Sequence, residues 1–106
     1  MNSRQRGRTT EKKAERELIA DGWTVYLVPP SKQWQRSQDI FNIFDLFTVR
    51  RGKFRLVQIK TNNLPNLQPF KEFWQENICP NLSVEVWIFY TKGKSKKYKG
   101  WRKIVI

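Results

Sequence analysis

Histidine is missing from this chain, and cysteine occurs once, at Cys79. Without histidine there can be no Ser-His-Asp or Cys-His nucleophile system, no histidine general base and no imidazole-bound zinc or iron. A single cysteine excludes a disulfide within the chain and a cysteine-rich zinc cluster. Any catalysis must therefore depend on carboxylates, lysines, amides and a metal ion that prefers oxygen ligands.

Long apolar runs and acidic residues are also scarce. The apolar stretches are no longer than strands, which excludes a membrane-spanning helix, and the polar, basic start shows no signal peptide. We therefore expect a cytoplasmic protein. The 106 residues include 21 Lys and Arg but 9 Asp and Glu, for a formal net charge of +12. Such an excess favours nucleic acid as the partner through counterion release at phosphates, and charge alone leaves a structural or packaging protein as an alternative.

The length predicts one α/β domain over residues 1–106. Residues 1–8 carry three arginines and no acid, and we expect them to form a mobile basic arm. Helices are predicted from residue 9 or 10 to 21, before Gly22, and at 70–77; strands are predicted at 23–28, 41–49, 54–61 and 82–90, with an optional edge strand at 101–106. The order α-β-β-β-α-β-(β) predicts a central mixed β-sheet flanked by helices.

Asp45 interrupts the apolar segment 41–49. Strand propensity and the cost of desolvation both disfavour a lone carboxylate there, so Asp45 needs a partner or a function. If Arg51-Gly52 forms the turn of a hairpin, Asp45 lies opposite Gln58, and Lys60 points to the same face. A three-residue loop would shift the pairing by one residue and separate Asp45 from Gln58.

Glu11 falls near the middle of the apolar stripe of the first predicted helix, which Ala14, Leu18 and Ile19 define. A carboxylate directed toward the sheet is costly unless it is paired. An acid in the first turn of a helix is, however, also favoured by the helix dipole and by nearby solvent. Glu11 taken alone leaves both interpretations open.

The predicted hairpin offers the oxygen ligands that Mg²⁺ and Mn²⁺ prefer. They are the carboxylate of Asp45, the side-chain amide of Gln58 and the backbone carbonyl of Ile59. Lys60 can orient or deprotonate an attacking water and neutralise charge in the transition state. Gln58 and Lys60 are also the polar residues expected where a strand nears its exposed end. Together with Glu11, they predict a site for Mg²⁺ or Mn²⁺.

These residues resemble the PD-(D/E)XK nuclease superfamily, and most closely the archaeal Holliday-junction resolvases. The resemblance covers residues 4–62 and rests on the basic stretch and glutamate in 6–11, the helix that follows it, and the segments 44–45 and 54–61. It implies a restriction-endonuclease-like fold. It also implies that Glu11 and Asp45 are acidic metal-site residues, that Lys60 is the motif lysine, and that Gln58 holds the position of the second acid.

Two residues depart from the pattern of this superfamily. Phe44 stands where the motif has proline, a substitution that the superfamily tolerates. Gln58 replaces a carboxylate and gives the form Q-x-K, which active members such as a transposase endonuclease subunit resemble. The lost negative charge implies weaker metal binding. Asp39 is a second candidate for the motif aspartate with poorer alignment to the hairpin, and Ser31 weakly matches a loop serine of the resolvases.

The sequence therefore predicts a metal-dependent DNA endonuclease. No base-reading motif is present, so we expect structure-directed cutting of a Holliday junction or other branched DNA, and two cuts on a junction would require a homodimer. The alternative on the same fold is a catalytically inactive, basic nucleic-acid-binding module. Contacts to nucleic acid are expected from Arg4, Arg6, Arg8, Ser31, Arg50, Arg51, Lys94, Lys96, Lys97 and Lys99.

Overall fold

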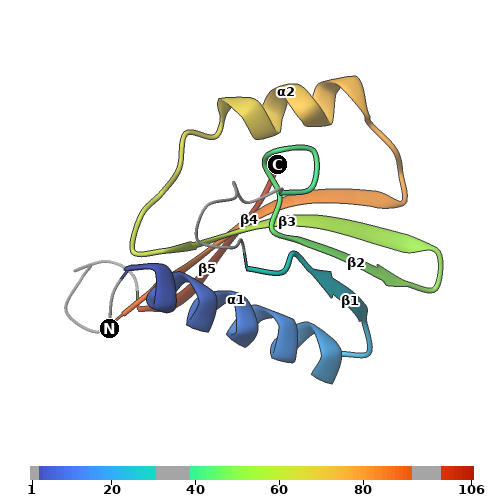
Figure 1. Cartoon of the computed structure of the whole chain (residues 1–106). Coiled ribbons are helices and arrows are strands. Elements are labelled where there is room, and N and C mark those ends of the chain that lie inside the picture. The colour runs from blue at the N-terminus through green and yellow to red at the C-terminus, as the bar shows by residue number, and fades with distance from the viewer. Residues whose placement is uncertain (1–2, 31–38, 92–98) are drawn as a thin grey trace.

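The computed structural model describes residues 3–30, 39–91 and 99–106, which build a five-stranded sheet with one helix on each face (Figure 1). The elements are α1 (Ser3–Ala20), β1 (Thr24–Leu27), β2 (Leu46–Arg50), β3 (Lys53–Thr61), α2 (Gln68–Glu76), β4 (Leu82–Tyr90) and β5 (Gly100–Val105). The strands lie in the order β1-β2-β3-β4-β5. The β3–β4 pair is parallel and the other pairs are antiparallel, which confirms the predicted mixed sheet.

The first helix begins earlier than its sequence indicated. It starts at Ser3, so the expectation of a basic arm is wrong from Ser3 onward. Arginine and glutamine are good helix formers, and the Thr10 hydroxyl, expected near a cap, instead donates to the Arg6 carbonyl one turn back (3.0 Å). The predicted end is confirmed: Gly22 has a φ of +90° and donates its N–H to the Ile19 carbonyl (3.0 Å), which is how glycine ends a helix.

The β2–β3 hairpin has the predicted register. Arg50 pairs with Lys53 and Leu46 with Val57. The turn residues Arg51 and Gly52 have φ values of 51° and 78°. Positive φ at both central residues matches the twist of a two-residue hairpin. The predicted β-strand register is therefore present from Leu46 to Arg50, and Asp45 lies directly before these pairs.

The strand β2 is shorter than the apolar run that predicted it. It begins at Leu46, whereas Phe41 and Asn42 have φ values of 51° and 68° and belong to a turn. Such φ values are outside the strand region. The preceding apolar residues pack against α2 instead, since the Phe44 ring contacts those of Phe70 and Phe73 at 5.7 and 5.1 Å. An apolar run alone does not distinguish a strand of the sheet from a turn that packs against a helix.

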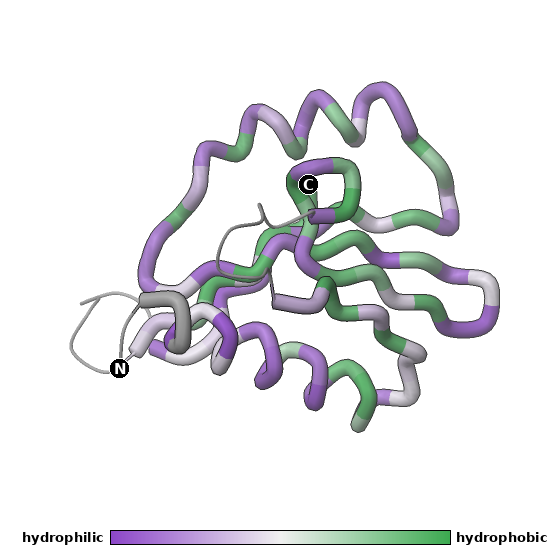
Figure 2. Tube along the Cα trace, viewed as in Figure 1, coloured by the Kyte–Doolittle hydropathy of each residue, from purple (hydrophilic) through white to green (hydrophobic). Residues whose placement is uncertain are grey.

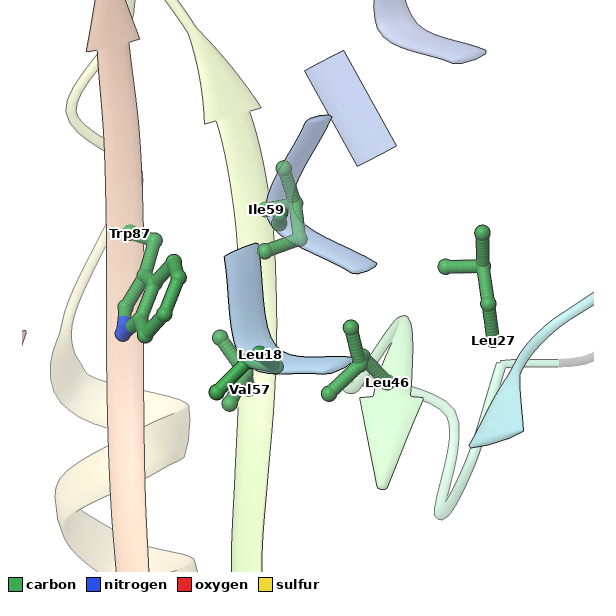
Figure 3. Packing of buried hydrophobic residues seen from close by; sticks show 7 residues of the cluster. Leu18, Leu27, Leu46, Val57, Ile59 and Trp87 are labelled. Atoms are coloured by element: carbon green, nitrogen blue, oxygen red, sulfur yellow. The ribbon is translucent and has the colours of Figure 1, made fainter. Parts of the chain in front are cut away.

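Each face of the sheet carries a hydrophobic cluster. Figure 2 shows hydrophobic residues concentrated in the central strands and hydrophilic ones along much of both helices. The cluster between α1 and the sheet consists of Ala14, Leu18, Leu27, Leu46, Val57, Ile59 and Trp87. Figure 3 shows all of these except Ala14 with labels. The cluster between α2 and the sheet consists of Phe44, Leu56, Phe70, Val84, Val86, Ile88 and Tyr90. Ile19, assigned to the apolar stripe from sequence, is 55% exposed. No helix in the described part of the chain is long and apolar enough to cross a membrane.

A charged cluster is enclosed in the α1 face of the sheet. Glu85 on β4 is 3% exposed. It accepts hydrogen bonds from Arg55 Nε and Nη2 (both 2.7 Å), Ser83 Oγ (2.7 Å) and Trp87 Nε1 (2.8 Å). Burial alone would raise the pKa of Glu85, but these donors, Arg55 first, lower it below its usual value of 4.5. The cluster therefore favours the ionised carboxylate.

Candidate active site

A β-bulge directs Asp45 at the point where β2 begins. Leu46 pairs with Val57, and the Asp45 N–H also donates to the Val57 carbonyl (3.0 Å). Two residues thus face one, which is the arrangement of a bulge and a recurrent means of redirecting a side chain. Because of this bulge, Asp45 does not pair directly with Gln58 as the sequence predicted. The carboxylate is instead held by the Ile59 N–H, which donates to Asp45 Oδ2 (2.8 Å).

The predicted catalytic residues meet in one open cleft of about 400 Å³. It lies where the N-terminal half of α1 passes the C-terminal end of β3 and the start of β2. The cleft includes every residue predicted to be catalytic or to bind metal, together with one predicted phosphate contact: Glu11, Asp45, Gln58, Ile59, Lys60 and Arg6.

Three carboxylates share this cleft, in a chain whose charge is otherwise strongly positive. Burial, the main cause, raises the pKa of Asp45 from 3.8 to about 7, against the lowering effect of the Ile59 N–H; the charges of Glu11 and Asp39 raise it further and that of Lys60 lowers it. Burial also raises the pKa of Glu11, with Asp39 adding to the effect and Arg8 opposing it. Buried neighbouring carboxylates of this kind attract a cation.

The donor set fits a hard metal ion. Within residues 3–30, 39–91 and 99–106, no group of three or more His, Cys, Asp or Glu side chains is placed to hold a metal. Mg²⁺, however, is commonly held by one or two carboxylates and keeps several waters. Glu11 and Asp45 supply two carboxylates. The Gln58 side-chain N–H donates to the Ile59 carbonyl oxygen (3.5 Å), so the side-chain amide lies beside that carbonyl. With the amide turned over, its oxygen and the carbonyl oxygen would be adjacent ligands.

Apart from Arg8, the predicted phosphate contacts divide into three groups. Arg6 lines the cleft. Lys99 directly precedes β5, whose first residue, Gly100, pairs with Tyr90. That pair lies at the end of the sheet where Thr61 also lies. Arg50 and Arg51 lie at the hairpin turn, roughly 16 Å along β2 from Asp45, and do not line the cleft. Ser31, Lys94, Lys96 and Lys97 fall outside the described residues, as does the side chain of Arg4.

Arg8 has a structural contact that the sequence did not suggest. Its Nη1 donates to the Val28 carbonyl (2.9 Å) and to Glu11 Oε1 (3.2 Å). The guanidinium therefore links α1 to the end of β1 and neutralises part of the charge of Glu11. Binding of DNA phosphate by Arg8 stays a prediction.

Two cleft residues were missed from the sequence, Thr61 and Asn63. The Thr61 hydroxyl donates to Thr10 Oγ1 (2.7 Å), which joins the end of β3 to α1 beside Glu11. The signal available was the position of Thr61 directly after Lys60. It is weak, because a threonine near the end of a strand is common.

Comparisons with known proteins give a similarity of fold. No family model matches this chain, and no curated protein matches it in sequence. Among solved structures, it is similar to Hjc of Archaeoglobus fulgidus, a Holliday junction resolvase from an archaeal hyperthermophile. The TM-score is 0.59 at 14% identity, over 93% of this chain and 76% of that one. The predicted α/β, restriction-endonuclease-like fold is thereby confirmed.

Proposed function

We propose that this chain is a metal-dependent endonuclease of the PD-(D/E)XK type, in the Q-x-K form, that hydrolyses phosphodiester bonds in branched DNA. The observation that carries the proposal is the meeting of Glu11, Asp45, Gln58 and Lys60 in one cleft of a strongly basic chain. The fold shared with a Holliday junction resolvase supports a four-way junction as the substrate. A second copy of the chain would supply the second cut.

In this proposal each residue has a distinct task. The Ile59 N–H fixes one oxygen of Asp45, which leaves the other oxygen for Mg²⁺ or Mn²⁺. Glu11, the Gln58 amide and the Ile59 carbonyl would supply the remaining oxygen ligands. A bound Mg²⁺ supplies polarisation of the scissile phosphate and a more acidic water. Lys60 offsets negative charge that develops on the phosphate and orients the attacking water.

Cleavage of a labelled four-way junction and a matched linear duplex, in Mg²⁺, Mn²⁺ or EDTA, tests the proposal. We expect metal-dependent cutting with a preference for the junction. Lys60→Ala should slow it by about 100-fold, because the cation opposite the developing charge is lost. The matched control is Lys53→Ala, at the exposed hairpin turn, which should cut at the wild-type rate. Tight binding of DNA without cleavage in any metal would refute the proposed nuclease activity.

Gln58→Glu separates the nuclease from the inactive binding module. Restoring a carboxylate should lower the Mg²⁺ concentration for half-maximal cutting by roughly tenfold, since ligand charge governs affinity for such ions. Gln75→Glu makes the same chemical change on the exposed surface of α2 and should leave the metal requirement unchanged. Equal metal requirements in all three proteins would remove Gln58 from the ligand set. Cutting by Gln58→Glu alone would make the wild-type chain the binding module.

A packaging protein accounts less well for the cleft. That alternative expects Glu11 and Asp45 to lie far apart, each paired with an arginine. Glu11 does contact Arg8, but Asp45 takes its hydrogen bond from a backbone N–H, and both carboxylates line one cleft.

A further inference from the structure

The turn between Asp39 and Asp45 places a phenylalanine in a backbone conformation that phenylalanine rarely adopts. Phe41 and Asn42 have φ values of 51° and 68°, and the Ile43 N–H donates to the Ile40 carbonyl across them (3.2 Å). Positive φ at both central residues of such a turn favours asparagine, aspartate or glycine. Asn42 meets that preference, whereas a bulky residue at Phe41 is strained.

Burial does not explain why a phenylalanine occupies this strained position. The Phe41 residue is 65% exposed. One side of its ring is supported, because its centroid lies 5.4 Å from that of Phe73, which in turn contacts the buried ring of Phe44. The ring is thus held in place while most of its surface faces solvent. Strain retained without burial points to a function for the side chain.

The turn also fixes Phe41 relative to the cleft. Asp39 and Asp45 both line the cleft, and Ile40 and Phe44 close the turn between them with two backbone hydrogen bonds (2.8 and 3.0 Å). Two residues of extended chain span at most about 7 Å, so the backbone at Phe41 lies no farther than that from the backbone at Asp39. An aromatic ring therefore projects from the segment that carries two of the cleft carboxylates.

We infer that Phe41 stacks on a nucleobase that is unstacked at the branch point of the DNA, an inference that rests on the proposed function. Phe41 does not itself line the cleft, and its ring packs on Phe73 of α2. A phosphate bound in the cleft would bring neighbouring bases toward the segment 39–45 that carries this ring. Aromatic side chains bind bases by stacking without reading their sequence, and apolar side chains placed at disrupted steps favour distorted DNA. In a continuous duplex the faces of the bases are covered by their neighbours. Phe41 would then distinguish branched from linear DNA, which the diffuse positive charge cannot do.

The test measures binding in EDTA, so it does not depend on cleavage. The probes are a four-way junction with 2-aminopurine at the branch point and a linear duplex of the same sequence. We expect the wild-type chain to change the 2-aminopurine fluorescence and to prefer the junction. Phe41→Asn should abolish the change and lower the ratio of junction to duplex affinity by about tenfold, the scale of one base stack. Phe41→Trp should restore both.

Two controls separate this role from a structural one. Asparagine suits the positive φ, which offsets the lost ring contact with Phe73. Phe41→Asn should therefore melt close to wild type, and lost selectivity cannot then be ascribed to unfolding. Ile78→Asn changes a residue of similar exposure (68%) outside the turn, and its affinity ratio should equal that of wild type.

Three results would overturn the inference. They are an unchanged affinity ratio and fluorescence in Phe41→Asn, the absence of any junction preference in the wild-type chain, and the conversion of a dimer to a monomer by Phe41→Asn, seen in sedimentation, with the ratio unchanged. The last result would assign Phe41 to contact with a second copy. Junction binding that requires Phe41, in a chain that never cuts DNA in any metal, would instead retain the stacking role and refute the proposed nuclease.

Discussion

Asp45→Asn is expected to slow metal-dependent DNA cleavage by at least about 1,000-fold and, in the same molecule, to stabilise the fold at neutral pH. Asparagine has nearly the same shape and can still accept the Ile59 N–H. It lacks the negative charge that would hold Mg²⁺ beside Glu11, and a metal that is not held cannot stabilise the charge of the transition state. The loss should appear in the rate of cutting, with junction binding in EDTA retained.

The gain in stability follows from the raised pKa of Asp45, about 7 in the folded chain against 3.8 ordinarily. Above pH 7 the carboxylate is ionised in both states, and the folded state bears the full cost of burying it. Between pH 7 and 3.8 the folded state binds the proton first, so that cost diminishes as the pH falls and is absent below 3.8. Asparagine removes a cost of at most about 4 kcal/mol above pH 7.

Urea unfolding of wild type and Asp45→Asn between pH 5 and 8, in EDTA, measures this difference. The variant should be the more stable at pH 8, with the advantage shrinking toward pH 5. Mg²⁺ should then raise the melting temperature of wild type and not of the variant, because bound metal stabilises the state that binds it. Asp21→Asn, a change at an exposed side chain, should show neither effect. A variant less stable than wild type at pH 8 would contradict this account of Asp45.

Glu85→Ala is expected to lower the free energy of unfolding by about 3–5 kcal/mol, the usual cost of removing one partner of a buried ion pair. The change leaves Arg55 without its two hydrogen bonds to the carboxylate and Trp87 Nε1 without an acceptor. Arg55 also lies over the rings of Trp23 and Trp87, 5.0 and 5.3 Å from their centroids. Those contacts cannot replace a carboxylate.

The pH dependence of Glu85 has the opposite sign to that of Asp45. Its pKa is lowered in the fold from 4.5, so its contribution to stability is present above pH 4.5 and is lost as the pH falls through the folded pKa. Urea unfolding of Glu85→Ala at pH 7 measures the cost, with the exposed Glu76→Ala as the matched control. A loss below about 1 kcal/mol would show that the cluster contributes little.

The register of the hairpin could be predicted because it depends on neighbouring residues. Alternation along β3 and the Arg51-Gly52 turn determine which residues pair, and Lys60 was thereby placed correctly. The bulge at Asp45 could not be predicted, because it depends on partners distant in sequence. The Asp45 carbonyl accepts the Val28 N–H (2.9 Å) while its N–H reaches the Val57 carbonyl, and neither contact leaves a local pattern.

Apolar runs were the weakest guide. Residues 41–44 have the composition of a strand, yet they form a turn whose rings pack on α2. Ile19 belongs with Leu18 to the apolar stripe predicted for the first helix, yet Ile19 is largely exposed in the structure. Both errors arise because a hydrophobic residue is expected to be buried, but the sequence pattern does not say against which helix or strand it will pack.

The strands of the sheet lie in the same order in space as in the chain. Each strand therefore pairs with the strand that precedes it in the chain. The longest connection between two such strands joins β3 to β4 and contains α2. Short closures cost little chain entropy and favour fast folding. During synthesis the sheet can grow by one strand at a time, and Glu11, Asp45, Gln58 and Lys60 would all have left the ribosome before β4 does. The cleft can thus begin to assemble on a nascent chain whose last two strands are still to be made.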